Sequence, residues 1–263
     1  MMFWVIQENL YNEEGFHTLL QALDRLEIPY EVVKVIPFSS ILTPEPTIPE
    51  GSKVVVMGAT SMTRIARERG WNPGAYFDND RYDYGSYIQG PWGPHLLNGD
   101  GLVCRFADVP EQKDLFFIRP VKDTKTFTGT VVDWGEFATW RHKVIDLGEQ
   151  DGSSLSADTR VVVAPPKVIY REYRIYIIDG KAVTGSLYKS GGRPRQDALV
   201  DDGVLRFAEA RAAEFTLSRA FVLDIADTPD GLKIIEAGCI NAAGYYKADI
   251  GKVVAALETL EGD

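Results

Sequence analysis

The most informative stretch of the sequence is EYRIYIIDGKAVTGSLY, residues 172–188. Two runs rich in aromatic and β-branched residues flank the pair Asp179-Gly180, and an Asp-Gly pair in this setting predicts a tight hairpin turn. Because successive side chains of a strand point to opposite faces, Glu172 and Arg174 share one face. The stretch therefore predicts an antiparallel hairpin that carries two charged side chains on the same side.

This charged pair has two interpretations. Arg174 would hold a phosphate or a carboxylate as a planar fork, with Glu172 orienting it or accepting from a ribose hydroxyl. The alternative is an exposed ion pair on a solvated face of the sheet, which contributes little to stability. The hairpin alone does not decide between them.

A second hairpin is predicted over residues 219–236, with its turn near Asp230. In that register Asp224 and Glu236 lie opposite one another on the same face. Two facing carboxylates repel, so they must share a proton or be neutralised by a cation, and hard oxygen ligands suit magnesium. Asn241 follows closely and would add a neutral oxygen ligand. Pairing of either acid with a surface lysine is the alternative.

A basic segment leaves the end of the apolar run at 114–118. It reads RPVKDTKTFTG, residues 119–129, and it holds three cations, Arg119, Lys122 and Lys125, together with three threonine hydroxyls. Such a concentration in an acidic protein predicts local phosphate binding. The alternative is a basic surface loop. Lys189, which begins the polar loop after the first hairpin, would supply a further cation.

The amino-acid composition excludes several classes of protein and disfavours some partners. The 263 residues are 45% hydrophobic and 25% charged, with only 2 cysteines, which excludes a disordered chain and a disulfide scaffold. The 28 Lys and Arg residues against 38 Asp and Glu leave a formal charge of -10, which disfavours nucleic acid and anionic membranes as partners. No basic leader and no apolar run of about 18 residues is present, so we expect a cytoplasmic protein.

The remaining sequence divides into two parts. Over residues 1–100, strand and helix patterns alternate as β-α-β-β-α, which predicts a small three-layer α/β domain. The stretch 70–101 is rich in aromatic residues among Asn, Asp, Gly and Pro, and it is either a plug between domains or the wall of a substrate site. From residue 102 onward strands dominate, with a helix after the first hairpin and another near the C-terminus. The common phosphate-loop, dinucleotide and protein-kinase motifs are missing from the sequence.

The order of these elements resembles the ATP-grasp superfamily, and more closely its clade named for a characteristic arginine and two lysines. The resemblance covers residues 96–257 and is carried by the basic segment, the Glu-x-Arg hairpin and the stretch IEAGCINAAGYY, residues 235–246. It implies an α+β ATP-grasp fold in which two subdomains, residues 101–165 and 166–263, hold ATP between them. The N-terminal α/β domain, residues 1–100, precedes that fold.

The resemblance also implies an activity, that of an ATP- and Mg²⁺-dependent carboxylate-amine ligase that acts through an acylphosphate. Its substrate would be a small molecule, an amino acid or a peptide with a carboxylate, together with an amine acceptor. The implied cofactor-binding residues are Arg119, Lys122, Lys125, Val163, Ala164, Pro165 and Glu172, and residues 163–166 would form the hinge against adenine. The implied catalytic residues are Arg174 and Lys189, and the implied ligands of one or two magnesium ions are Asp224, Glu236 and Asn241.

Two features depart from the family pattern. Arg119-Pro120 stands where many relatives have lysine and proline, and the usual Glu-x-Asn spacing is stretched between Glu236 and Asn241. By resemblance, the polar loop 189–203 would be a lid over the acylphosphate. A nucleotide-binding sensor without ligase activity and a phosphotransferase that uses the same site are the alternative functions. The sequence does not specify the substrate or the oligomeric state.

Overall fold

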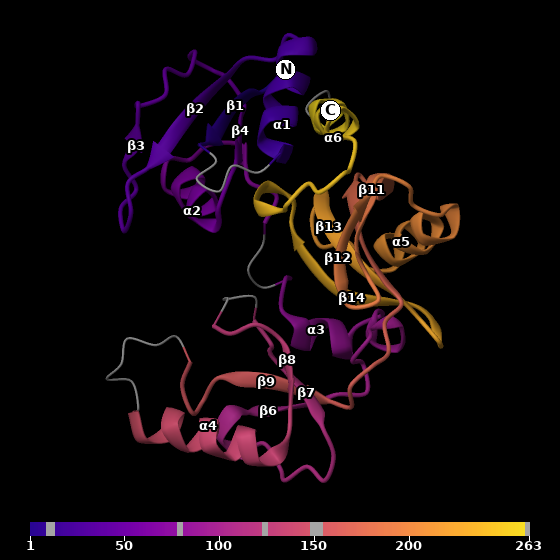
Figure 1. Cartoon of the computed structure of the whole chain (residues 1–263). Coiled ribbons are helices and arrows are strands. Elements are labelled where there is room, and N and C mark those ends of the chain that lie inside the picture. Colours follow the sequence, from indigo (N-terminus) through magenta and orange to yellow (C-terminus); the bar gives the residue numbers. More distant parts are fainter. Residues whose placement is uncertain (9–13, 78–80, 123–125, 148–154, 261–263) are drawn as a thin grey trace.

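The computed structural model describes residues 1–8, 14–77, 81–122, 126–147 and 155–260. Within these residues the strands form three sheets, which lie in different parts of the molecule (Figure 1). A mostly parallel sheet holds the N-terminal strands, a small antiparallel sheet holds the middle of the chain, and a large antiparallel sheet holds the C-terminal strands. None of the described helices is both long and apolar enough to span a membrane.

The N-terminal sheet has the strand order β3-β2-β1-β4-β5, and only β3 runs antiparallel to its neighbour. Its strands are β1 (Phe3–Gln7), β2 (Tyr30–Val35), β3 (Leu42–Thr43), β4 (Val54–Met57) and β5 (Pro73–Gly74), and its helices are α1 (Glu14–Arg25) and α2 (Thr60–Glu68). β1 and β4 are continuous apolar runs because both faces of the sheet are covered. The predicted β-α-β-β-α alternation is confirmed, with β3 and β5 added at the edges.

The small sheet has the order β6-β9-β7-β8. Its strands are β6 (Leu102–Arg105), β7 (Phe116–Pro120), β8 (Thr130–Val132) and β9 (Arg160–Ala164), and the short helix η2 (Phe106–Asp108) follows β6. Helix α4 (Trp134–Leu147) packs Phe137 and Trp140 against Phe106, with ring centroids 5.1 and 4.9 Å from the Phe106 ring. We did not predict this helix from the sequence.

The large sheet has the order β12-β11-β10-β13-β14. Its strands are β10 (Arg171–Ile178), β11 (Lys181–Ser190), β12 (Arg193–Asp197), β13 (Ala220–Thr228) and β14 (Gly231–Cys239). Both predicted hairpins are confirmed, and Asp179 and Gly180 adopt φ values of 49° and 76°, as a two-residue hairpin turn requires. The exposed strand β12 lies inside the polar loop predicted at 189–203.

Two cores cover the two faces of the large sheet. Helix α5 (Asp202–Glu214) and the segment that contains α3 (Tyr84–Gln89) and η1 (Gly93–His95) pack on one face, where Tyr84, Tyr87 and Trp92 are buried. In Figure 1, α3 lies between the large and the small sheet. Part of the aromatic stretch therefore packs between the two sheets, as the plug interpretation predicts, and its interpretation as the wall of a substrate site stays a prediction.

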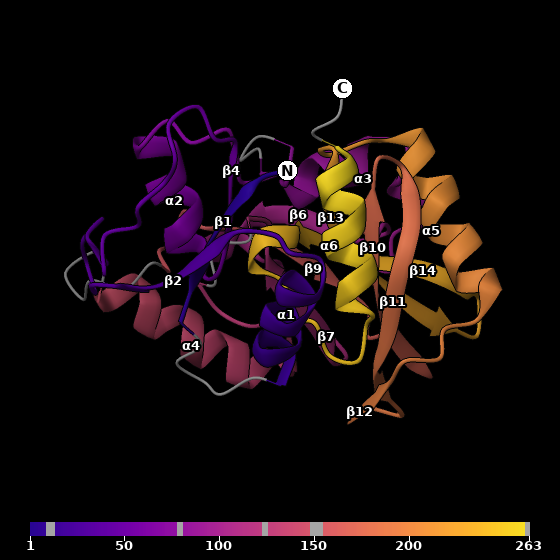
Figure 2. The same ribbon diagram turned by 90° about the horizontal axis from the view of Figure 1, so that it is seen from above.

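The other face of the large sheet shares a core with the N-terminal sheet. Helix α6 (Ile250–Thr259) packs beside α1, as both views show (Figure 2), and Trp4 lies in this core with Tyr176 and Val254. The short helix η4 (Ile240–Ala242) also contributes, through Ile240. The N-terminal sheet and the C-terminal strands are thus joined by apolar packing.

One half-buried carboxylate, that of Glu258, connects the start of the chain to the last helix. Glu258 accepts from the Trp4 indole Nε1 at 2.7 Å and from the Met2 backbone nitrogen at 3.0 Å. We expect Glu258→Ala to lower the free energy of unfolding by about 2 kcal/mol, because it leaves these buried donors without their acceptor. Glu258→Gln keeps one amide oxygen and should lose less. Urea unfolding followed by circular dichroism measures both, and equal losses in the two variants would contradict this explanation.

Candidate functional site

A row of charged side chains crosses one face of the large sheet. Strand register pairs Arg174 on β10 with Asp224 on β13, and Asp224 with Glu236 on β14. The facing carboxylates that the second hairpin predicts are therefore confirmed. The opposite face of the same strands carries Ile175 and Leu223, which are buried in the core beneath α5. The row is thus placed by the period-two alternation of the strands.

Arg174 and Asp224 form a buried, two-pronged ion pair. The guanidinium donates from Nε to Oδ1 and from Nη2 to Oδ2, both at 2.8 Å, and the side chains are only 16% and 5% exposed. Burial by itself lowers the pKa of Arg174, but the charge and hydrogen bonds of Asp224 raise that pKa well above its usual value. The guanidinium also lies 5.9 and 5.2 Å from the ring centroids of Tyr188 and Tyr246, which stack on each other. Arg174 is therefore a fixed positive charge.

Glu236 has its own arginine, which comes from a different sheet. Arg119, on β7, donates from Nη2 to Glu236 Oε2 at 2.9 Å. Its guanidinium lies 4.7 Å from the centroid of the Tyr84 ring, a favourable position for a cation over an aromatic face. Burial raises the pKa of Tyr84 to about 12, so its hydroxyl stays neutral. This ion pair joins the small sheet to the large one beside the charged row.

The third charged group lies at the start of the first hairpin. Register pairs Glu172 with Lys189, and the Lys189 ammonium lies 3.0 Å from Glu172 Oε1. Tyr188 donates to Glu172 Oε2 at 3.0 Å, and burial, with the charges of Asp224 and Glu172, raises the pKa of this tyrosine. With only 12% of its side chain exposed, Glu172 is not part of a solvated ion pair with Arg174. The predicted residues of this hairpin are brought together, each with its own partner.

Asn241 lies on η4 and is engaged elsewhere. Its amide oxygen accepts from the backbone nitrogen of Tyr76 at 2.8 Å, and its amide nitrogen donates to the carbonyl of Val56 at 2.7 Å. The residue is buried, and the Gly58 backbone nitrogen donates to its carbonyl at 2.8 Å. This amide therefore fastens η4 to the N-terminal domain, a placement that does not support its predicted role as a magnesium ligand.

The other predicted site residues that the structure describes lie in the small sheet or next to its strands: Val163, Ala164, Pro165 and Lys122. Val163 and Ala164 are buried at the end of β9, and the exposed Pro165 begins the connection to β10. Lys122 is exposed and pairs through an isolated backbone bridge with Asp83. Lys125 lies outside the described residues.

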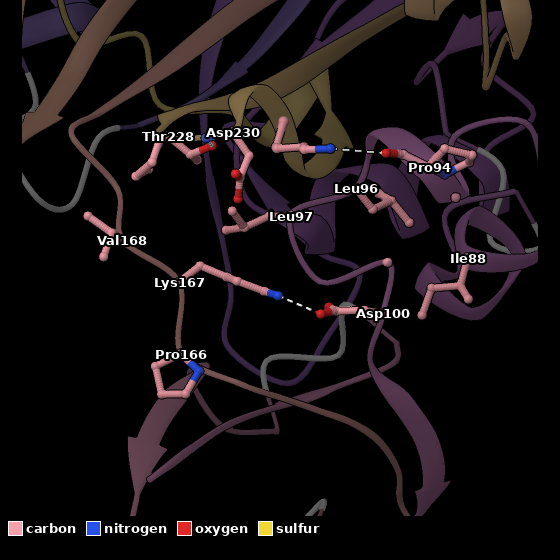
Figure 3. Close-up of a pocket in the computed structure, with 14 residues that line it drawn as sticks. Ile88, Pro94, Leu96, Leu97, Asp100, Pro166, Lys167, Val168, Thr228 and Asp230 are labelled. Atoms are coloured by element: carbon pink, nitrogen blue, oxygen red, sulfur yellow. Dashed lines mark hydrogen bonds and ion pairs between the residues drawn. The ribbon is translucent and has the colours of Figure 1, made fainter. Parts of the chain in front are cut away.

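A pocket of about 800 Å³ adjoins the predicted hinge (Figure 3). It lies between the connection 166–168, the segment 93–100 that leads into β6, and the turn between β13 and β14. The Lys167 ammonium lies 2.5 Å from Asp100 Oδ2. Figure 3 shows that this ion pair crosses the space between the first two of these segments. Pro166, the last residue of the predicted hinge, lines the pocket.

The sequence patterns did not identify the tyrosines that contact the two arginines. Tyr188 lies in the first hairpin, but regular pairing from the Asp179-Gly180 turn would place it on the opposite face from Arg174, and the register shift between Tyr176 and Ile177 brings the two side chains to the same face. Tyr84 and Tyr246 are brought to their arginines by the tertiary fold, and no local pattern indicates those contacts. Among the described residues, no group of three His, Cys, Asp or Glu side chains is placed to hold a metal ion.

Comparison with known proteins identifies the fold of this site. Residues 51–257 match a family model of the ATP-grasp domain, that of family 3 in the clade named for one arginine and two lysines. The structure of D-cycloserine synthetase DcsG is similar, with a TM-score of 0.61 at 13% identity over 99% of this chain and 100% of that one. D-alanine–D-alanine ligase from Bacillus anthracis has a TM-score of 0.59 at 12% identity, covering 98% and 92%.

A third similar structure is the ATP-grasp ligase PsnB, complexed with a minimal precursor, with a TM-score of 0.52 at 14% identity and coverage of 98% and 99%. The search of curated proteins found no match. At such low identities the similar structures establish the fold alone, whereas the family match extends over most of the sequence. The chain belongs to the ATP-grasp domains, in family 3 of the clade named for one arginine and two lysines.

Proposed function

We propose that this protein is an ATP- and Mg²⁺-dependent carboxylate-amine ligase that forms an amide bond through an acylphosphate. The observation that carries the proposal is the row of Arg174, Asp224 and Glu236, joined by Arg119 from the facing sheet. Fixed positive charges and carboxylates on one face are what phosphoryl transfer requires, because its catalysis rests on positioning and charge stabilisation. The site needs no protein nucleophile.

The nucleotide is proposed to lie between the two antiparallel sheets. Arg119 would contact its phosphates, helped by Lys122 and Lys125 of the same basic segment. The hinge at 163–166 would contact the base, and the pocket of about 800 Å³ supports this placement because Pro166, at the end of the hinge, lines it. Glu172, held by Lys189 and Tyr188, would accept from a ribose hydroxyl.

The carboxylates of the row suit magnesium. Glu236 is 41% exposed, so its oxygens are accessible, and Mg²⁺ is commonly held by one or two carboxylates together with substrate phosphates and water. Both oxygens of Asp224 already accept from Arg174, and we propose that this acid acts beside Glu236 chiefly by fixing the arginine. When bound, the ion would neutralise charge that develops on the phosphates.

The proposed reaction has two steps, phosphorylation of the carboxylate and attack by the amine. An oxygen of the substrate carboxylate attacks the γ-phosphorus of ATP, the bond to the β-phosphate oxygen breaks, and ADP leaves. An amine then attacks the acyl carbon, phosphate leaves with the bonding electrons, and the amine loses a proton. Arg174 and Lys189 would stabilise the acylphosphate. The names of the similar ligases support an amino acid or a peptide as the substrate class.

Two measurements test this function. A thermal-shift titration with ATP, with and without Mg²⁺, should raise the melting temperature, because ligand at a hundredfold excess over its Kd stabilises the folded state by about 2.7 kcal/mol. Mixtures of amino acids and peptides as carboxylate and amine donors should then release ADP and phosphate. ATP binding without any ADP release would favour a nucleotide-binding sensor, and a stable phosphorylated product would favour a phosphotransferase.

The pocket gives a prediction about the base. Val168 lines it and is 62% exposed, so tryptophan at this position should extend into the pocket without disturbing a core. We expect Val168→Trp to raise the Kd for ATP about tenfold, equivalent to about 1.4 kcal/mol, by excluding the base. Ile41→Trp is the control, because Ile41 is 59% exposed, belongs to the N-terminal domain and does not line the pocket. If both variants bind ATP as the wild type does, the base lies elsewhere.

A further inference from the structure

The two ion pairs of the charged row differ in burial and in the number of hydrogen bonds that hold them. Arg174 and Asp224 lie on neighbouring strands of one sheet, make two hydrogen bonds and are nearly buried. Arg119 and Glu236 come from different sheets and are joined by a hydrogen bond of 2.9 Å, and the Glu236 side chain is 41% exposed. The second pair is therefore the one that can open without unfolding a sheet.

Arg119 keeps support when that pair opens. Its guanidinium lies over the Tyr84 ring, which is 1% exposed and fixed in the core between the sheets, and its Nε donates to the carbonyl of Pro120 at 3.3 Å. The arginine would thus keep its position on the Tyr84 ring as Glu236 takes another partner. Tyr84 is a positioning residue in this arrangement, because its ring holds Arg119 in place.

We infer that Arg119 is a removable counter-ion that closes Glu236 to free divalent cations, so that the site accepts a metal together with a triphosphate rather than a metal alone. This inference rests on the proposed function. A free cation that approaches Glu236 meets the positive charge of Arg119 and must displace it without offering it a new partner. A metal-triphosphate complex brings both charges at once, a cation for Glu236 and phosphate oxygens for Arg119.

The inference predicts a gain of metal binding on removal of the arginine. Titration with Mn²⁺ alone, followed by electron paramagnetic resonance without nucleotide, should show about tenfold tighter binding to Arg119→Gln than to the wild type. Arg119→Lys keeps the charge and should stay within about threefold of the wild type. Lys122→Gln is the matched control, because it removes a nearby exposed cation of the same segment, which is bridged through its backbone to Asp83.

The double variant Arg119→Gln/Glu236→Gln tests whether the gain in Mn²⁺ affinity arises at Glu236. If it does, this variant should abolish the gain. Equal Mn²⁺ affinity in wild type and Arg119→Gln, no Mn²⁺ binding to either, or a gain that persists in the double variant would each overturn the inference. A gain of similar size in Lys122→Gln would also overturn it, because a general field effect would then suffice. Because these titrations contain no nucleotide, their failure is distinct from failure of the ligase proposal, which shows as absent ATP binding and ADP release.

Discussion

Replacing Glu236 with glutamine is expected to remove the magnesium-dependent part of ATP binding and to slow ADP release at least about a hundredfold. The substitution keeps the size of the side chain and an oxygen that still accepts from Arg119 Nη2, so the link between the sheets survives. It removes the negative charge that a hard cation requires, and neutral amide oxygens are poorer partners for Mg²⁺ than carboxylates. The loss should therefore appear in metal-dependent steps and not in folding.

Isothermal titration with ATP, in the presence of Mg²⁺ or of a chelator, separates these effects. The variant should bind ATP about equally under both conditions, whereas the wild type should bind more tightly with Mg²⁺. Glu68→Gln is a suitable control, because Glu68 pairs with Arg64 on α2, away from the row, and should leave both affinities unchanged. A Glu236→Gln variant that keeps the magnesium effect would show that the metal is held by other groups.

The facing acids could be predicted because the pattern that places them is local. A turn centred at Asp230 predicts Asp224 opposite Glu236, and the structure has this pair. Its turn, however, pairs Thr228 with Gly231, and a register shift between Asp224 and Ile225 restores the predicted pairing. The partner of each acid depends on longer-range information. Arg174 contacts Asp224 only because β10 pairs with β13. The sequence patterns do not indicate which strands of the two hairpins pair. The arginine that we expected to meet a ligand is thus already paired within the protein.

Other differences have similar physical causes. Tyr84 reaches Arg119 because α3 packs between the sheets, and no spacing in the sequence encodes that contact. Asn241 lies in the last of the stretches that carry the family resemblance, yet its side-chain amide forms hydrogen bonds with backbone groups of the N-terminal domain. Helix α4 was missed for another reason. Its aromatic residues Trp134, Phe137 and Trp140 recur every three residues, as on a helix, but the strand patterns on both sides of them obscured this signal.

Asp224→Asn is expected to cause the largest loss of stability, about 3 kcal/mol of unfolding free energy. Arg174 cannot give up its proton when its partner is neutralised, and its side chain is only 16% exposed, so the variant leaves a buried charge without a counter-charge. The double variant Arg174→Met/Asp224→Leu removes both charges and should recover much of the loss, since apolar side chains of similar size can replace a buried pair.

An exposed pair of the same kind provides the comparison for this prediction. Arg105 also binds an aspartate with two hydrogen bonds, from Nε to Asp108 Oδ2 at 2.6 Å and from Nη2 to Oδ1 at 3.1 Å, but both side chains are more than half exposed. Asp108→Asn should therefore destabilise the protein far less than Asp224→Asn in urea unfolding, because water solvates the arginine that remains and Asp158 Oδ1 still accepts from its Nη1 at 2.9 Å. If the two substitutions cost the same, burial does not set the strength of the Arg174–Asp224 pair. Arg174 would then be free to turn toward a ligand, and its assignment as a fixed charge in the row would be wrong.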